Sequence, residues 1–150
     1  MKETFALVDA LLEKPIQYLH VSLWDFYKKI RRGADTTQLR IEALHKRINN
    51  RVPFIGVSNL YTADDMLNAY NTGYVDSLAI GKSVMLNPNL VQLIESGRES
   101  EIETTFDWDK AEKYRYTNAM LDGTCRGIDF IQNQNNLNYA IKAKIIKKLN

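Results

Sequence analysis

Apolar residues follow two different spacings along the first two thirds of the chain, and the change from one to the other predicts its elements. Three short apolar runs, at 16–21, 52–57 and 75–80, predict buried strands. Segments with apolar residues three or four positions apart predict helices at 5–13, 37–48, 62–73 and 89–95. This alternation of helices and strands is typical of an α/β fold with right-handed crossovers and a parallel sheet.

Individual residues mark where the predicted helices begin and end. Pro15 stops the first helix, and Thr37 and Thr62 stand where N-caps belong. Asp65, three residues after Thr62, completes the pattern of a capping box, and Gly73 supplies the stop. The stretch 62–73 is therefore the best-delimited helix that the sequence predicts.

Polar residues and glycine follow the second and third predicted strands. Ser58 and Asn59 come after the run 52–57, and Gly81 and Lys82 come after the run 75–80. The carboxyl ends of parallel strands meet at one edge of a sheet, which is where α/β folds bind ligands. Hydroxyl, amide, backbone N–H and ammonium groups are all donors to a phosphate. The pattern therefore predicts an anion site formed by these four residues.

Composition narrows the class of protein. The chain has 150 residues, a net charge of +2, 45% hydrophobic and 25% charged residues, which is typical of one globular domain or part of one. Its lone cysteine, Cys125, has no partner for an intrachain disulfide, which favours a reducing compartment. The sequence shows neither a secretory signal at its start nor an apolar run of bilayer length. We therefore expect a cytoplasmic protein with no membrane or nucleic-acid partner.

Two basic segments leave alternatives open. The cluster Lys28, Lys29, Arg31 and Arg32 is either a solvated loop or an anion-facing lid, because it follows a strand's carboxyl end. The segment 137–149 places lysines against isoleucines and leucines, as in a packed terminal helix or a helix that binds nucleic acid or anionic membrane. The nearly balanced net charge favours a packed helix.

Two stretches carry a family resemblance. Gly56 to Asn59 and Ala79 to Lys82 are followed by an ordered run of Leu86, Asn87-Pro88, Leu90 and Gly97-Arg98. In this the chain resembles the C-terminal part of the old yellow enzyme family of NAD(P)H-dependent flavin oxidoreductases, which are FMN-binding (β/α)8 barrels. Segment 20–22 would correspond to the sixth barrel strand, 53–59 to the seventh, and 77–99 to the eighth with its following helix.

The resemblance implies a fold, a cofactor and a reaction. Residues 1–106 would form part of a (β/α)8 TIM barrel, about strands six to eight, and 107–150 a C-terminal helical extension. Ser58, Asn59, Gly81 and Lys82 would hold the phosphate of FMN. The family reaction passes hydride from NADH or NADPH through the flavin to a small acceptor such as an activated alkene. Lys82 stands where the family usually has Arg, and Ser58 replaces a frequent Gly, so this chain departs from the family at two phosphate contacts.

The length of the chain bears on activity. A complete barrel takes about 250 residues, and the family's first five strands, with its flavin-ring contacts and proton donor, have no counterpart here. We interpret the chain as the C-terminal portion of an oxidoreductase or as a natural half-barrel, completed by a missing N-terminal half or by a second copy. Alone, it is expected to be inactive, and its catalytic residues are unknown. A noncatalytic half-barrel that binds phosphate or a partner chain, and a nucleic-acid-binding module, are the alternatives from other classes.

Overall fold

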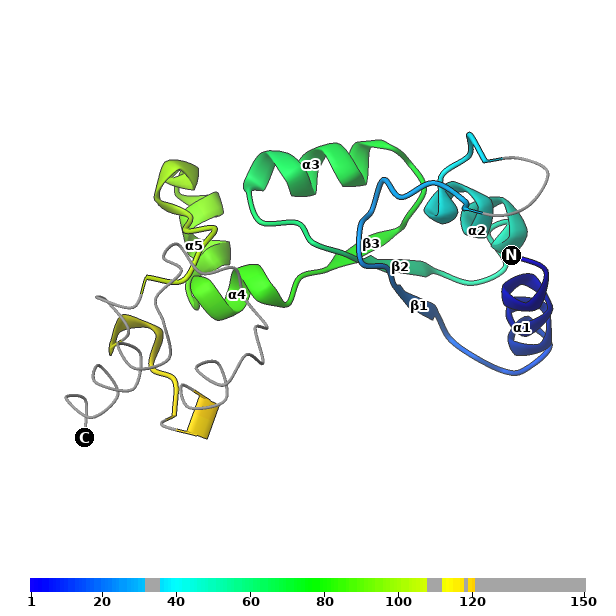
Figure 1. Cartoon of the computed structure of the whole chain (residues 1–150), viewed down its shortest axis with the longest axis horizontal. Helices are drawn as coiled ribbons and strands as arrows, with labels where there is room; N and C mark the ends of the chain where they lie inside the picture. Colours follow the sequence, from blue (N-terminus) through cyan, green and yellow to red (C-terminus); the bar gives the residue numbers. More distant parts are fainter. Residues whose placement is uncertain (32–35, 108–111, 118, 121–150) are drawn as a thin grey trace. The chain divides into compact units, whose positions relative to one another are not determined.

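A computed structural model describes residues 1–31, 36–107, 112–117 and 119–120 of the chain (Figure 1). The chain divides into two compact units, Met1–Ile80 and Gly81–Asn150, which are described separately below. Cys125 and the basic segment 137–149 lie outside the described residues. Among the residues that are described, no helix combines the length and apolar character needed to cross a bilayer.

The first unit is an α/β unit built on a small parallel sheet. Its elements are α1 (Lys2–Leu12), β1 (Leu19–Ser22), α2 (Arg40–Ile48), β2 (Phe54–Val57), α3 (Ala63–Asn71) and β3 (Ser77–Ala79). The strands lie in the order β1-β2-β3, and both neighbouring pairs are parallel. The predicted α/β class and parallel sheet are therefore confirmed, with the same order of elements along the chain.

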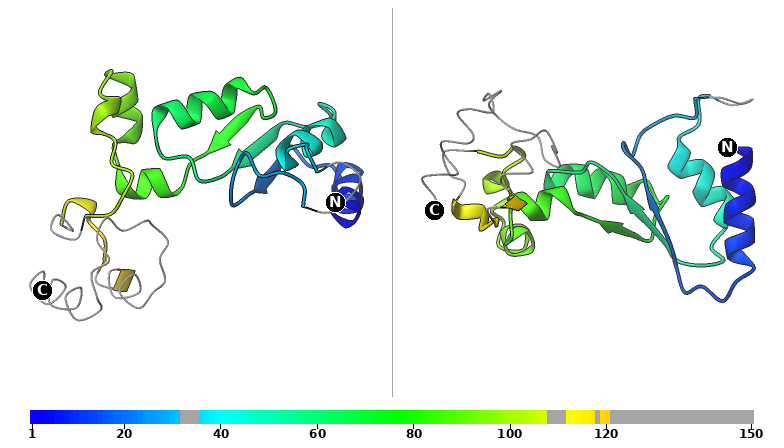
Figure 2. Two further views of the ribbon diagram at one scale, coloured as in Figure 1. Left: turned by 45° about the horizontal axis from the view of Figure 1, so that its top comes forward. Right: turned by 60° about the horizontal axis from the view of Figure 1, so that its bottom comes forward.

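One face of this sheet is packed against helices. Leu19 of β1 and Phe54 of β2 lie in the same buried cluster as residues of α2 and α3. α2 has a period-3.6 apolar stripe, which is why it buries one side: Ile41, Ala43, Leu44 and Ile48. α1 lies beside α2 in all views, and it buries Val8 (Figures 1 and 2).

The opposite face of the sheet is less covered. The register aligns His20 with Ile55 and Ser77, and Ser22 with Val57 and Ala79. Successive side chains of a strand point to opposite faces, so these six residues share the face that Leu19 and Phe54 do not occupy. Ile55, Val57 and Ala79 are half-buried, whereas the three polar residues are exposed.

Both edges of the sheet keep main-chain groups turned away from β2. The amides of Leu19 and Leu23 donate to carbonyls of Pro53 and Val57, at 2.9 and 2.8 Å. Alternate residues of a parallel strand bond to the same neighbour, so the main chain of His20 and Ser22 faces the free side of β1. By the same alternation, Ser77 and Ala79 face the free side of β3, because the amide of Asp76 bonds Phe54.

The start of α2 differs from the prediction. Thr37 does not cap this helix, because α2 begins at Arg40 with Leu39 as an N-cap that makes no side-chain cap bond. Gln38 and Leu39 pair instead with the segment before them in the chain. Leu39 forms an antiparallel bridge with Lys29, and the amide of Ile30 donates to the Gln38 carbonyl at 3.0 Å. Pairing with a distant segment thus holds the backbone extended where the local pattern predicts helix.

The start of α3 agrees with the prediction in detail. Thr62 Oγ1 accepts from the Asp65 amide, and Asp65 Oδ2 accepts from the Thr62 amide, both at 3.0 Å. These backbone bonds to the carboxylate, that from Thr62 foremost, lower the pKa of Asp65 below its usual range. Gly73 has φ +70° just after the helix, a conformation that favours glycine.

The strands are shorter than the runs that predicted them. β1 begins at Leu19 instead of residue 16, and β3 spans only Ser77–Ala79. Residues 75 and 76 contribute differently: Val75 is buried in the core, and Asp76 accepts the Phe54 amide through Oδ2 at 2.7 Å. The Asp76 side chain therefore accepts the Phe54 amide at the point where a main-chain carbonyl would have extended the hydrogen-bond ladder between β2 and β3.

The second unit begins with two short helices, α4 (Lys82–Leu86) and α5 (Leu90–Glu95), followed by the 3-10 turn η1 (Glu99–Glu101). The sequence pattern predicted α5 but not α4. Asn87 is buried between the helices, and its Nδ2 donates to the carbonyls of Ser83 and Glu103 at 3.0 and 2.8 Å. Gly97, at φ +67°, ends α5. Its amide and that of Arg98 bond back to Ile94 and Leu93, which is a Schellman motif.

Gly56 sits where side chains of three segments converge, and this generates a stability prediction. A Cβ there would lie 2.8 Å from Val75 Cγ1 and within 3.6 Å of Phe26 and Ile41. We expect Gly56→Ala to lower the free energy of unfolding by about 1–3 kcal/mol, the usual range for overpacking. The control is Gly81→Ala, because a Cβ at Gly81 meets nothing within 4 Å. Urea denaturation followed by circular dichroism measures both; equal stability of the two variants would contradict the prediction.

Candidate phosphate-binding site

The carboxyl ends of β2 and β3 lie side by side in the first unit. Val57 and Ala79 are aligned partners in the parallel register, so Ser58 and Ile80 leave the sheet from neighbouring positions. Gly81 and Lys82 follow Ile80 along the chain but begin the second unit. The four residues predicted to bind phosphate thus fall two in each unit: the structure describes each one, and their common site stays a prediction.

The hydroxyl of Ser58 is the most informative group of the candidate site in the first unit. The residue is half-buried, and its Oγ is buried without a hydrogen-bond partner among the described residues. A buried hydroxyl that lacks a partner is destabilising by about 1–3 kcal/mol, and native proteins rarely leave one. At the end of a strand, such a group is suited to bonding a ligand oxygen.

Asn59 is exposed, in a short loop with fixed ends. The loop begins at the end of β2 and ends in the Thr62–Asp65 capping box, and the Leu60 amide donates to the Ser58 carbonyl at 3.0 Å. These bonds restrict the backbone that presents Ser58 and Asn59. The loop is thus built to hold the two side chains near the strand end.

Gly81 and Lys82 differ in what the protein itself requires of them. Gly81 is exposed with φ −104°, and no neighbour restricts a Cβ there, so neither backbone conformation nor packing explains a glycine. The space beside it is open to close approach by a ligand. Lys82 is half-buried and is the first residue of α4, so it brings a positive charge directly after Gly81 in the chain.

Other residues singled out in the sequence do not belong to this group of four. His20 is exposed on the less covered face of the sheet, and the His45 ring lies 6.0 Å from that of Tyr74. The basic loop is tied down, since the Lys28 carbonyl accepts the Arg40 amide at 2.9 Å. Arg32 lies outside the described residues. Within the described residues, no group of His, Cys, Asp or Glu is arranged to hold a metal ion.

Polar residues and glycine after two strands of an α/β unit make this a protein with a candidate phosphate site. Comparison with known proteins identifies the family. Residues 1–101 match the NADH:flavin oxidoreductase / NADH oxidase family. The chain belongs to this family, which confirms the resemblance to old yellow enzymes.

A curated relative agrees with this family. It is the probable NADH-dependent flavin oxidoreductase YqiG of Bacillus subtilis (strain 168), with 42% identity over 114 residues. The matched region is 76% of this chain and 30% of the relative. The chain therefore spans less than a third of the length of the relative that it matches.

Proposed function

We propose that this chain is the C-terminal portion of an FMN-dependent NAD(P)H oxidoreductase of the ene-reductase type, and that it contributes the loops that bind the FMN phosphate. Membership of the flavin oxidoreductase family supports this, as does the name of the B. subtilis relative. The observation that carries the proposal is the buried, unpartnered hydroxyl of Ser58 at a strand end whose neighbour continues into Gly81 and Lys82. A cytoplasmic location is part of the same proposal.

The residues present fit a phosphate monoester. Ser58 offers a hydroxyl, Asn59 an amide, Gly81 open space beside the backbone, and Lys82 a cation. A lysine acts as a point charge where arginine would provide a two-pronged fork, so orientation would depend more on the neutral donors. Bound FMN would supply the hydride transfer chemistry between nicotinamide and acceptor. This chain would anchor the cofactor at its phosphate end.

We further propose that the sheet is part of a (β/α)8 barrel, in which the less covered face would be the barrel interior. The half-buried Ile55, Val57 and Ala79 on that face, and the free edges of β1 and β3, support this reading. The missing strands would come from the N-terminal half of the barrel or, for the chain alone, be replaced by contacts with a second copy. Either partner would supply pairing to the main chain of His20 and Ser22.

Titration with FMN tests the phosphate site. We expect Lys82→Ala to weaken FMN binding by about 1.5–3 kcal/mol, the value of a charge-assisted hydrogen bond, and Lys82→Arg to retain it. Ser58→Ala should weaken binding without lowering the free energy of unfolding, because it removes a hydroxyl that has no partner among the described residues. Flavin fluorescence quenching measures the affinity.

Two comparisons decide whether the phosphate is what the site binds. Riboflavin, which lacks the phosphate, should bind more weakly than FMN to the unaltered chain. The affinity for riboflavin should be the same for Lys82→Ala as for the unaltered chain. Lys14→Ala removes an exposed lysine from the first unit and should leave FMN affinity unchanged. Equal affinities for riboflavin and FMN, or equal losses in the two lysine variants, would refute the proposed site.

Turnover of the chain alone is expected to be no faster than that of free FMN. The chain matches only 30% of its relative, and the proposed missing part would orient the flavin ring and place a proton donor. NADH oxidation is followed by absorbance with FMN and an activated alkene, with and without protein. Saturable alkene reduction by the chain itself would show that this chain suffices for catalysis and would contradict the expectation.

Association is expected at micromolar concentration, because no described strand pairs with either outer edge of the sheet and its open face is partly apolar. Sedimentation velocity should detect a dimer or larger species. Val57→Lys, which places a charge on the open face, should shift the protein toward monomer, whereas Tyr70→Lys on the exposed surface of α3 should not. A compact wild-type monomer that binds no hydrophobic dye would contradict the half-barrel interpretation.

A further inference from the structure

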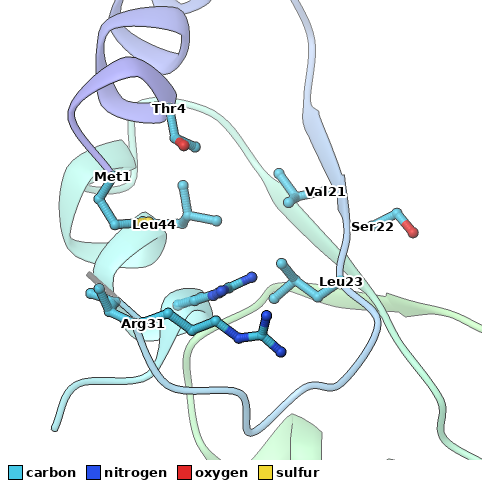
Figure 3. A pocket seen from close by; sticks show the side chains of 9 residues that line it. Met1, Thr4, Val21, Ser22, Leu23, Arg31 and Leu44 are labelled. Atoms are coloured by element: carbon cyan, nitrogen blue, oxygen red, sulfur yellow. The ribbon is translucent and has the colours of Figure 1, made fainter. Parts of the chain in front are cut away.

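A cavity of about 520 Å³ lies in the first unit, between the start of α1, the end of β1 and α2 (Figure 3). Its size falls in the range of small-ligand sites, about 300–1,000 Å³. None of the residues predicted to bind phosphate borders it. The lining residues are Met1, Thr4, Val21, Ser22, Leu23, Ile30, Arg31, Arg40 and Leu44.

The lining divides into an apolar part and a cationic part. Val21 and Leu23 point to one side of β1, toward Leu44 and Met1, whereas the Ser22 hydroxyl points to the other side of the strand (Figure 3). The cationic part comes from Arg31 and Arg40, and none of the described lining residues is acidic. The cavity therefore combines two guanidinium cations with walls suited to hydrocarbon.

Backbone pairing holds the two arginines in place. The amide of Arg40 donates to the Lys28 carbonyl at 2.9 Å, and its Nε donates to the Lys29 carbonyl at 3.2 Å. Arg31 follows Ile30, a buried residue whose amide donates to the Gln38 carbonyl at 3.0 Å. The guanidinium of Arg40 thus uses one of its five N–H groups in a described bond and has others to offer a ligand.

Two other described arginines, Arg47 and Arg98, have partners of opposite charge. Arg47 bonds both carboxylate oxygens of Asp9, and Arg98 bonds both oxygens of Glu101. Among the described residues, no carboxylate pairs with Arg31 or Arg40. Two anchored cations beside an apolar hollow are arranged to receive an anion from outside the described chain.

We propose that this cavity binds a small organic anion, with a carboxylate or phosphate head held by Arg31 and Arg40 and a short hydrocarbon body against Val21, Leu23 and Leu44. A guanidinium forms paired hydrogen bonds with either head group. This site shares no residue with the proposed flavin phosphate site, and its existence does not depend on flavin binding.

Calorimetric titration of the full chain tests the proposal with four probes. Octanoate and octyl phosphate carry both parts of the expected ligand, inorganic phosphate only a head, and 1-octanol only a body. We expect saturable binding of octanoate or octyl phosphate, at least about tenfold tighter than of inorganic phosphate or octanol, since each half contributes. The tighter of the two anions identifies the head group. No saturable binding of either, or octanol binding as tightly as octanoate, would overturn the proposal.

Variants locate the binding. Arg31→Gln and Arg40→Gln should each weaken the better anion about tenfold, whereas Arg98→Gln, an exposed arginine of the second unit, should not. Thr4→Trp should fill the cavity and abolish binding with both guanidinium groups kept. Thermal unfolding of each variant checks that it is folded. Equal weakening by Arg31→Gln and Arg98→Gln, or undiminished binding to folded Thr4→Trp, would place the anion elsewhere.

Discussion

The close approach of three segments over Gly56 is the constraint on which the first unit depends. Gly56 lies in β2, the central strand, with Val75, Phe26 and Ile41 around the place that a side chain would occupy. Val75 leads into β3, Phe26 follows β1, and Ile41 belongs to α2, so one missing Cβ lets the sheet and its cover pack together. Gly56 is also the register partner of Val21 in β1 and of Leu78 in β3, so this packing lies one position before the ends of the strands.

The two faces of the sheet differ in a way that gives the family assignment a physical meaning. The face with Leu19 and Phe54 contributes to the buried core, whereas Ile55 and Val57 on the opposite face are only half-buried. A sheet with helices on one face and free edges is suited to continuing sideways into further strands. Membership of the flavin oxidoreductase family and the partial coverage of the B. subtilis relative agree with that reading.

Charged residues fall into two groups with different consequences. The pair of Arg47 and Asp9 joins α2 to α1; its hydrogen bonds raise the pKa of Arg47 and lower that of Asp9. Such exposed pairs contribute little to stability. The cavity arginines, Arg31 and Arg40, lie instead beside hydrocarbon, where a cation gains more from an external anion. The second group is therefore where ligand binding is expected.

Local patterns in the sequence determined the order of elements in the first unit, the capping box of Thr62 and Asp65, the turn at Gly73 and the family, because each of these is encoded by neighbours in the chain. Tertiary structure decided the rest. α2 starts at Arg40 because Gln38 and Leu39 pair with Ile30 and Lys29. That pairing also brings two arginines nine positions apart in the chain to one cavity, and the burial that leaves the Ser58 hydroxyl unpartnered exists only once the unit is folded. Contacts between distant segments depend on packing, which spacing along one segment does not encode.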